Sequence, residues 1–228
     1  MLTILKRIKG KLTGSNVIAP QPDFRMDALK NILDNGLGHK KSFELQKPVD
    51  NGGNPLPWFT YPAIEYIKQL DLRKLAILEW GIGNSSLFFA ARCNEIVSVE
   101  HNKEWFDLIS GSMPSNAHAI FATEDEYDVI PLQQNRKFDI IIVDGIKRAD
   151  CINVAIKLME ENGIIIFDNS DRNPDLCEIL RNQNLLQIDF HGFGPINPYA
   201  WTTSLFFSRS NTLKPLSVQP LIPAGGGY

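Results

Sequence analysis

The stretch of residues 77–86 reads ILEWGIGNSS and is the most informative part of the chain. An apolar run typical of a strand ends at Glu79, Gly81-x-Gly83 follows, and a helix is expected to start near Ser85. Glycine lets the backbone turn tightly and approach a ligand closely. In a doubly wound sheet this position is the carboxyl edge, where ligands bind. The stretch therefore predicts a ligand-binding turn between a strand and a helix; a tight turn without a ligand is the alternative.

Outward from this turn, apolar runs of strand length alternate with helical segments. Such alternation predicts an α/β fold, a doubly wound and mostly parallel seven-stranded sheet with helices on both faces. The last two strands are joined by HGFGPINPYAW, which has no helical signal, so we expect them to form an antiparallel terminal hairpin. The expected strands are LAILE (75–79), EIVSVE (95–100), HAIFA (118–122), FDIIIVD (138–144), GIIIF (163–167), LLQIDF (185–190) and TTSLFFS (202–208).

The helices expected between these strands are placed by capping residues. Asn102 is a good N-cap for one, and Asn173 with Pro174 at the first helical position begins another. A helix from about 149 to 161 should end at Asn162-Gly163, a C-cap signal. We also expect helices within 57–67, lying over the ligand, and within 27–33.

Composition excludes several classes of protein. Hydrophobic residues make up 43% of the 228 positions and charged residues 21%, which argues against a disordered chain. No apolar run approaches the length of a transmembrane helix. The net charge of −3 argues against a broad nucleic-acid surface, which needs a basic face. Cys93, Cys151 and Cys177 are odd in number and widely spaced, so neither a disulfide framework nor a zinc cluster is expected, and a cytoplasmic location is the default.

A second acid supports ligand binding at the glycine turn. Glu100 ends the second expected strand, 21 residues after Glu79. A carboxylate at that distance suits a ribose diol, because it can accept hydrogen bonds from both hydroxyls. An NAD(P)-dependent oxidoreductase could use the same turn, although a closing antiparallel hairpin would be unusual for that class of enzyme.

The turn resembles motif I of the class I S-adenosylmethionine-dependent methyltransferases, an acid followed by Gly-x-Gly, and the resemblance runs from about Leu75 to Ser208. It implies a Rossmann-like methyltransferase fold with S-adenosylmethionine as cofactor. Gly81 and Gly83 would face the amino-acid and ribose parts of the cofactor, with Ser85 where the family often has a third glycine. Glu79 would lie near the methionine ammonium, and Glu100 would hold the ribose hydroxyls.

Four further residues are candidates for contacts with the cofactor. In this fold the segment FATEDEYD commonly reaches the adenine amine, which favours Asp125, and His101 is placed to pack on the adenine. Trp58 and Tyr61 are expected to close the methionine end of the site. A solvated acidic loop and core packing are the respective alternatives for Asp125 and for the aromatic pair.

Two more acids end expected strands. Asp144, Asp168 and Asn169 would offer three oxygen ligands on neighbouring strands, a set that suits Mg²⁺ or another divalent cation. Such a metal would bind a substrate hydroxyl and lower its pKa. Lys147 could act as general base if its own pKa is lowered.

The pattern DGIK followed by DNSD resembles that of the catechol and caffeoyl-CoA O-methyltransferases. The resemblance implies that the two acids and the Asn bind metal while the Lys assists deprotonation. The alternative is that Asp168 and Asn169 cap the loop and that Asp144 holds cofactor or substrate without a metal. In a metal-free enzyme the candidate base is His191 or His101.

Substrate contacts are expected around the same strand ends. Arg148 and Arg172 could hold a carboxylate or phosphate, or could pair with the nearby Asp150, Asp171 and Asp175. Tyr199 and Trp201 in the loop between the last two strands have amphipathic rings suited to sugar or aromatic faces, unless they pack under the loop.

These patterns together predict an S-adenosylmethionine-dependent methyltransferase that O-methylates a hydroxyl of a small molecule, such as a sugar, a polysaccharide precursor or a secondary metabolite. The alternatives are the oxidoreductase and a non-catalytic cofactor-binding protein. We expect an N-terminal extension (1–54), the catalytic domain (55–210) and a flexible tail (211–228). Residues 1–12, basic and amphipathic, could contact a membrane surface or a partner, and a homo-oligomer remains open.

Overall fold

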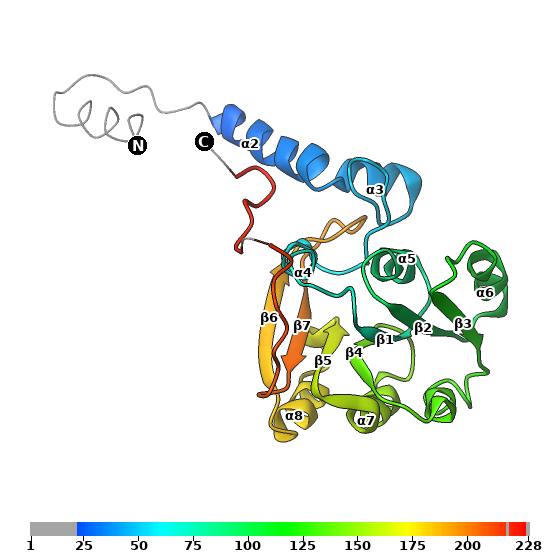
Figure 1. Cartoon of the computed structure of the whole chain (residues 1–228). Helices are drawn as coiled ribbons and strands as arrows, with labels where there is room; N and C mark the ends of the chain where they lie inside the picture. Colours follow the sequence, from blue (N-terminus) through cyan, green and yellow to red (C-terminus); the bar gives the residue numbers. More distant parts are fainter. Residues whose placement is uncertain (1–21, 218, 227–228) are drawn as a thin grey trace, which may run out of the picture.

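The computed structural model describes residues 22–217 and 219–226 of the chain (Figure 1). The expected membrane or partner segment, residues 1–12, lies outside this part. Among the described helices, none is both long enough and apolar enough to span a bilayer.

A seven-stranded sheet forms the centre of the molecule, in the order β3-β2-β1-β4-β5-β7-β6. The first five strands pair in parallel, and β7 pairs antiparallel with both β5 and β6. The predicted fold class is therefore confirmed, including the antiparallel hairpin. The strands are β1 (Ala76–Trp80), β2 (Glu95–Glu100), β3 (Ala117–Phe121), β4 (Phe138–Val143), β5 (Met159–Asp168), β6 (Leu186–Gly192) and β7 (Trp201–Phe207).

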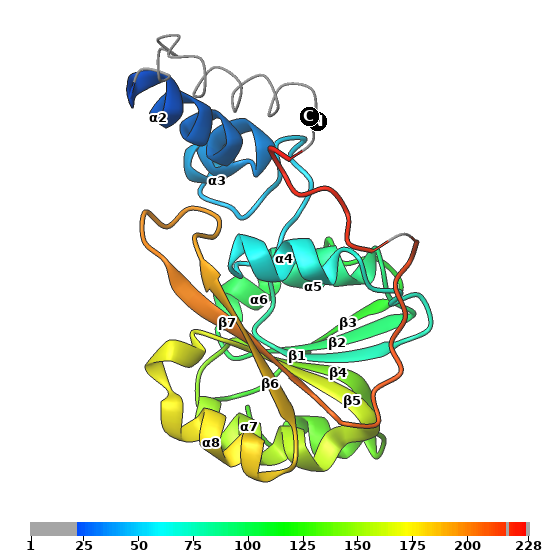
Figure 2. The same cartoon turned by 90° about the vertical axis from the view of Figure 1, so that its left-hand side faces the viewer.

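Helices cover both faces of this sheet, and Figure 2 shows α4 and α5 on one side with α7 and α8 on the other. Each face has its own buried apolar cluster: Phe59, Ile64 and Phe89 belong to the first, and Cys151 and Leu180 to the second. Burial on both faces explains why β4 and β5 are continuous apolar runs. The helices are α2 (Pro22–Asn31), α3 (His39–Leu45), α4 (Tyr61–Ile67), α5 (Asn84–Ala90), α6 (Lys103–Ser110), α7 (Arg148–Leu158) and α8 (Pro174–Asn182), with a π-helical turn at Ile32–Gly36.

Capping residues meet the expectations in part. Asn102 caps α6, since its Oδ1 accepts a 2.9 Å hydrogen bond from the backbone N–H of Trp105. Asn173 stands at the start of α8, but its side chain instead donates to the backbone oxygen of Asn169 at 3.1 Å. That bond fixes the loop after β5 rather than the helix.

The expected end of α7 was wrong. The helix stops at Leu158 and β5 begins at Met159, so that Asn162-Gly163 lies inside the strand instead of capping the helix. The cause is the pairing with β4, in which Phe138 already faces Met159 before the register shifts. Tertiary pairing thus overrides a local C-cap signal.

The chain beyond β7 runs back along the domain, as the red segment in Figure 2 shows. Leu213 packs against the first apolar cluster, and Pro215 forms an isolated bridge with Leu70. Backbone hydrogen bonds join Asp71 to Lys214 and Leu216 to Gln69, each at 2.9 Å. These contacts lie at the amino ends of the parallel strands, away from the carboxyl edge.

Candidate functional site

The glycine turn between β1 and α5 needs glycine at one of its two positions for conformational reasons. Gly81 has φ +102°, which strains any residue with a side chain, and its N–H donates to the Val99 oxygen at 2.9 Å. Gly83 is extended, with φ 176°, and a Cβ built on it would meet nothing within 4 Å. Space therefore lies open over Gly83, where a ligand can approach the backbone.

Glu79, at the end of β1, is buried beside this turn. Its Oε2 accepts hydrogen bonds from Ser86 Oγ and, at 2.8 Å, from Ser98 Oγ, while its Oε1 is buried without a partner among the described atoms. Burial raises the pKa of Glu79 to about 7. The structure therefore places this acid under the turn, where its carboxyl holds Ser86 and Ser98.

Glu100 at the end of β2 is fixed by backbone amides. Its Oε1 accepts from the N–H groups of His101 and Asn102 at 2.8 and 2.7 Å, and its Oε2 accepts from Ile82 at 3.2 Å. Because each carboxylate oxygen has two lone pairs, Oε2 keeps one position for a ligand hydroxyl. The carboxylate thus joins the end of β2 to the glycine turn. It keeps one free acceptor position for a ligand, whereas binding both hydroxyls of a ribose diol would take two.

Three other candidates for cofactor contacts have different surroundings. His101 lies beside Glu100, with its ring edge-on to Tyr127 at a centroid distance of 5.4 Å. Asp125 is exposed and forms no hydrogen bond within the described part of the chain. Tyr61 is buried in the first apolar cluster against His39, the core-packing alternative, and burial raises the pKa of its hydroxyl.

Sequence reasoning missed Trp105 of α6. Its indole Nε1 donates a 2.7 Å hydrogen bond to the Ile82 oxygen, in the middle of the glycine turn. The side chain is 40% exposed, so it forms part of the surface beside the turn. The available signal was the capping residue Asn102, which orients the first turn of α6.

A pocket of about 270 Å³ lies next to the turn, at the carboxyl ends of β4 and β5. It brings together residues expected for three separate roles: the acids, one arginine and the aromatic side chains. Asn197, from the loop between β6 and β7, was not expected. The lining residues are Trp58, Asp144, Asp168, Asn169, Arg172, Asn197, Tyr199 and Trp201.

The two acids of this pocket have pKa values above that of an ordinary aspartate. Asp168 is 2% exposed, and its Oδ1 accepts from Thr203 Oγ1 and from Trp201 Nε1, the latter at 3.0 Å. Burial raises the pKa of Asp168 to about 6. Burial, followed by the neighbouring Asp168 carboxylate, raises the pKa of Asp144 well above its usual range.

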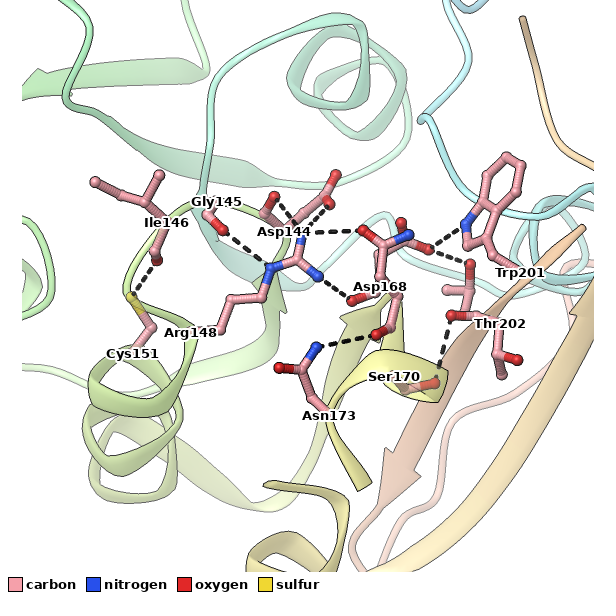
Figure 3. A network of polar contacts seen from close by, with 12 residues as sticks. Asp144, Gly145, Ile146, Arg148, Cys151, Asp168, Ser170, Asn173, Trp201 and Thr202 are labelled. Atoms are coloured by element: carbon pink, nitrogen blue, oxygen red, sulfur yellow. Dashed lines mark hydrogen bonds and ion pairs between the residues drawn. The ribbon is translucent and has the colours of Figure 1, made fainter. Parts of the chain in front are cut away.

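Arg148 lies beneath the pocket and bridges the ends of β4 and β5 (Figure 3). Its Nε donates to the Gly145 oxygen at 3.0 Å and its Nη1 to the Asp168 backbone oxygen at 2.5 Å. Its Nη2 lies 3.1 Å from both the Asp144 backbone oxygen and Asn169 Oδ1, and 3.4 Å from Asp144 Oδ1. The guanidinium is engaged with the protein on all three nitrogens, so it does not line the pocket as a substrate ligand.

This arrangement does not fit the expected metal site. The guanidinium stands between Asp144 and Asn169, where the cation would have to bind, and Oδ1 of Asp168 is occupied by Trp201 and Thr203. The described residues also contain no cluster of three or more His, Cys, Asp or Glu side chains that could hold a metal ion.

Lys147 does not meet the condition for a general base. Its Nζ forms an ion pair with Asp128 and donates to the Glu124 oxygen at 3.1 Å. The hydrogen bond with Asp128 raises the pKa of Lys147, whereas a base acting near neutral pH needs a lowered one.

His191 lines a different pocket, of about 190 Å³, on the α8 side of the hairpin with Asp171 and Cys177. Its Nδ1 lies 2.6 Å from Thr202 Oγ1. The structure thus separates this histidine from the pocket that contains Asp144. Arg172, by contrast, is exposed at the pocket, and its side chain forms no ion pair or hydrogen bond with any residue that the structure describes.

Between the two strand ends, Gly145 packs against Tyr127. A Cβ at Gly145 would lie 1.9 Å from the phenol oxygen of Tyr127, whose side chain is fully buried. The close approach brings Gly145 against the turn, since a Cβ at Gly81 would lie 3.7 Å from the Gly145 backbone. The Asp144 N–H also donates to the Trp80 oxygen at 3.4 Å, so the loop after β4 is hydrogen-bonded to the residue that precedes the glycine turn.

A further cavity lies away from this edge. It has a volume of about 290 Å³, is formed at the amino ends of the parallel strands by residues such as Lys74, Asp139 and Lys214, and contains no expected site residue. The chemistry-bearing side chains gather instead at the carboxyl edge, where α/β sheets bind ligands.

No protein-family model and no curated protein sequence matches the chain. Solved structures do resemble it. A protein from Klebsiella pneumoniae assigned as an O-methyltransferase has a TM-score of 0.51 at 15% identity, over 90% of this chain and 96% of that one. The precorrin-6y C5,15-methyltransferase of Geobacter metallireducens has a TM-score of 0.51 at 14% identity, over 64% of this chain and 86% of its own. With its strand order and closing hairpin, the chain has the fold of the class I S-adenosylmethionine-dependent methyltransferases.

Proposed function

We propose that this protein is an S-adenosylmethionine-dependent methyltransferase that methylates a hydroxyl group of a small molecule. The observation that carries the proposal is the contact between the turn of Gly81 and the loop of Asp144 and Gly145. A cofactor over the open backbone of Gly83 and an acceptor in the pocket of Asp144 would share this wall, as transfer between two bound molecules requires.

The residues around the turn would hold the cofactor. Gly83 leaves the backbone accessible, and Glu100 offers its remaining acceptor to a ribose hydroxyl. Trp105, in the first turn of α6, bonds to the same turn, and His101 lies beside Glu100 just before that helix. When bound, the cofactor supplies an electrophilic methyl carbon attached to a sulfonium.

Asp144 is the residue we assign as general base. Its carboxyl lines the pocket, and in ionised form it would accept the proton of the acceptor hydroxyl as the oxygen bonds to the methyl carbon. The bound cofactor would give up its methyl group and keep the electron pair of that bond, so the products would be the methyl ether and a neutral thioether. The raised pKa of Asp144 makes it a stronger base than an ordinary aspartate.

The remaining pocket residues suit a polar ring as acceptor. Trp58 and Tyr199 are 43% and 48% exposed, and Tyr199 lies edge-on to Trp201. Aromatic faces with Asn197 and Arg172 beside them match a sugar, a polysaccharide precursor or a hydroxylated secondary metabolite. Residues 55–210 would form the catalytic domain of a cytoplasmic enzyme.

The first experiment is a thermal-shift series with S-adenosylhomocysteine, NAD⁺ and NADP⁺. A ligand that binds the native state at a hundred times its Kd stabilises it by about 2.7 kcal/mol. We expect a shift with S-adenosylhomocysteine alone; a shift with a nicotinamide cofactor instead would make the protein an oxidoreductase. A panel of hydroxylated acceptors then distinguishes an enzyme from a non-catalytic binding protein. An enzyme methylates at least one acceptor, and the Asp144→Asn variant should lose that activity.

A further inference from the structure

Five oxygen atoms from four residues surround the guanidinium of Arg148. They are the backbone oxygens of Asp144, Gly145 and Asp168, the side-chain oxygen of Asn169 and Oδ1 of Asp144. All come from residues at or directly after the ends of β4 and β5 (Figure 3). No nitrogen or sulfur ligand takes part, so this cradle has the chemistry of a site for a hard cation.

Nη2 is the centre of this cradle. Three oxygens approach that one nitrogen: Asp144 O at 3.1 Å, Asn169 Oδ1 at 3.1 Å and Asp144 Oδ1 at 3.4 Å. A divalent cation at this position would take the same three atoms, with shorter bonds of about 2.0–2.6 Å, and complete its shell with water. The cation and the guanidinium therefore compete for one place.

The arginine is well anchored there. Its side chain is 20% exposed, and it starts from the first residue of α7, so its own helix holds it under the strand ends. Its Nε and Nη1 make further hydrogen bonds to Gly145 and Asp168, which a divalent cation at the Nη2 position would not replace.

We propose that Arg148 is the resident cation of this site: it fills the place of a divalent metal, holds the ends of β4 and β5 together and orients the Asp144 carboxyl toward the pocket. Arg148 is thus a positioning residue, and the site accepts no divalent metal while Arg148 is present. Removing the guanidinium creates a metal site from the oxygens that it leaves unpaired. This inference does not depend on the acceptor or on methyl transfer, because it concerns only the cation at the strand ends.

The test is calorimetric titration of the full-length, metal-free protein with Mn²⁺, and separately with Ca²⁺, at pH 8. The wild type should show no binding. Arg148→Ala should bind one Mn²⁺ per chain with a Kd on the order of 10⁻³ M or tighter, the range of weak oxygen-ligand sites. Arg148→Lys, which keeps a cation in the cradle, should behave as the wild type.

Two further variants keep the test decisive. Arg148→Gln has a neutral side chain of similar length and carries the test if the alanine variant does not fold, which circular dichroism reports. In the double variant Asp144→Asn, Arg148→Ala, Mn²⁺ binding should be lost, because the one carboxylate among the three oxygens becomes a neutral amide. Mn²⁺ binding by the wild type, or no binding by a folded neutral variant, would overturn the proposal.

Discussion

The indole Nε1 of Trp201 donates a 3.0 Å hydrogen bond to Oδ1 of Asp168, and so joins the first residue of β7 to the last residue of β5. Both side chains line the pocket, and both are at least 96% buried. The antiparallel hairpin is therefore part of the candidate site and not only the edge of the sheet.

Replacing the indole tests this connection. Trp201→Phe keeps an aromatic ring but removes the donor, which leaves a buried carboxyl oxygen with Thr203 as its remaining partner. We expect a loss of about 1–3 kcal/mol in the free energy of unfolding, measured by urea denaturation. The control is Tyr199→Phe, since Tyr199 is exposed in the same pocket, and it should stay within about 0.5 kcal/mol of the wild type. Equal stability of the two variants would contradict this role for Trp201.

The two glycines of the turn form a matched pair. Gly81→Ala should destabilise the protein by about 1–3 kcal/mol, because alanine is strained at φ +102°. Gly83→Ala should leave the unfolding transition unchanged, since φ 176° is extended and nothing lies within 4 Å of the new Cβ. The same methyl group would enter the cofactor space, so calorimetry should show the affinity for S-adenosylhomocysteine reduced by about tenfold or more, the equivalent of 1.4 kcal/mol. Unchanged affinity in Gly83→Ala would place the cofactor elsewhere.

Glu79 makes stability depend on pH. The pKa of Glu79 is about 7 in the folded protein, against 4.5 for an ordinary glutamate. Between these two pH values Glu79 is protonated in the folded state and ionised in the unfolded state. The free energy of unfolding should therefore fall as pH rises from about 4.5 to 7, with Glu79 contributing up to about 3 kcal/mol.

Urea denaturation at pH 5 and pH 7.5 measures this slope. Glu79→Gln, which is neutral at both values, should reduce it, and the part that remains comes from Asp144 and Asp168, whose shifts have the same sign. Glu178→Gln, at an exposed position of α8, should retain the full slope. A slope that is the same in all three proteins would mean that Glu79 is ionised throughout.

The carboxyl pair should also control the pH dependence of methyl transfer. If Asp144 must be ionised to accept the proton, kcat/KM rises with pH and reaches its plateau above the range of an ordinary aspartate. The Asp168 carboxylate raises the pKa of Asp144, so Asp168→Asn should move this rising limb to lower pH. Asp175→Asn, at an exposed position of α8, should leave the limb in place. If the rising limb does not shift in Asp168→Asn, a group other than Asp144 controls it.

The strands and the glycine turn could be predicted from the sequence because their signals are local. Apolar runs bounded by turn residues mark β1, β4 and β5, and the edge at which their ends meet follows from parallel topology. The pocket could be predicted in outline for the same reason, since Asp144 and Asp168 end adjacent strands.

The direction of a side chain could not be predicted in this way. Arg148 and Lys147 are neighbours in sequence, yet Arg148 bonds to the end of β5 whereas Lys147 pairs with Asp128. Lys147 has φ +47° and precedes the first helical turn of α7, so the two side chains leave the backbone in different directions. The expected metal set does not fit for this reason: the side-chain oxygens of Asp144 and Asn169 approach Arg148, whereas the carboxyl of Asp168 accepts from Trp201 and Thr203.

The packing of Tyr127 on Gly145 has an evolutionary consequence. The phenol fills the space of a side chain at position 145, and its neighbour in that contact is 18 residues away along the chain. A side chain at position 145 would clash with the phenol, and a smaller residue at 127 alone would leave a cavity in the core. Each single substitution is therefore costly, and homologous sequences should show the two positions changing together.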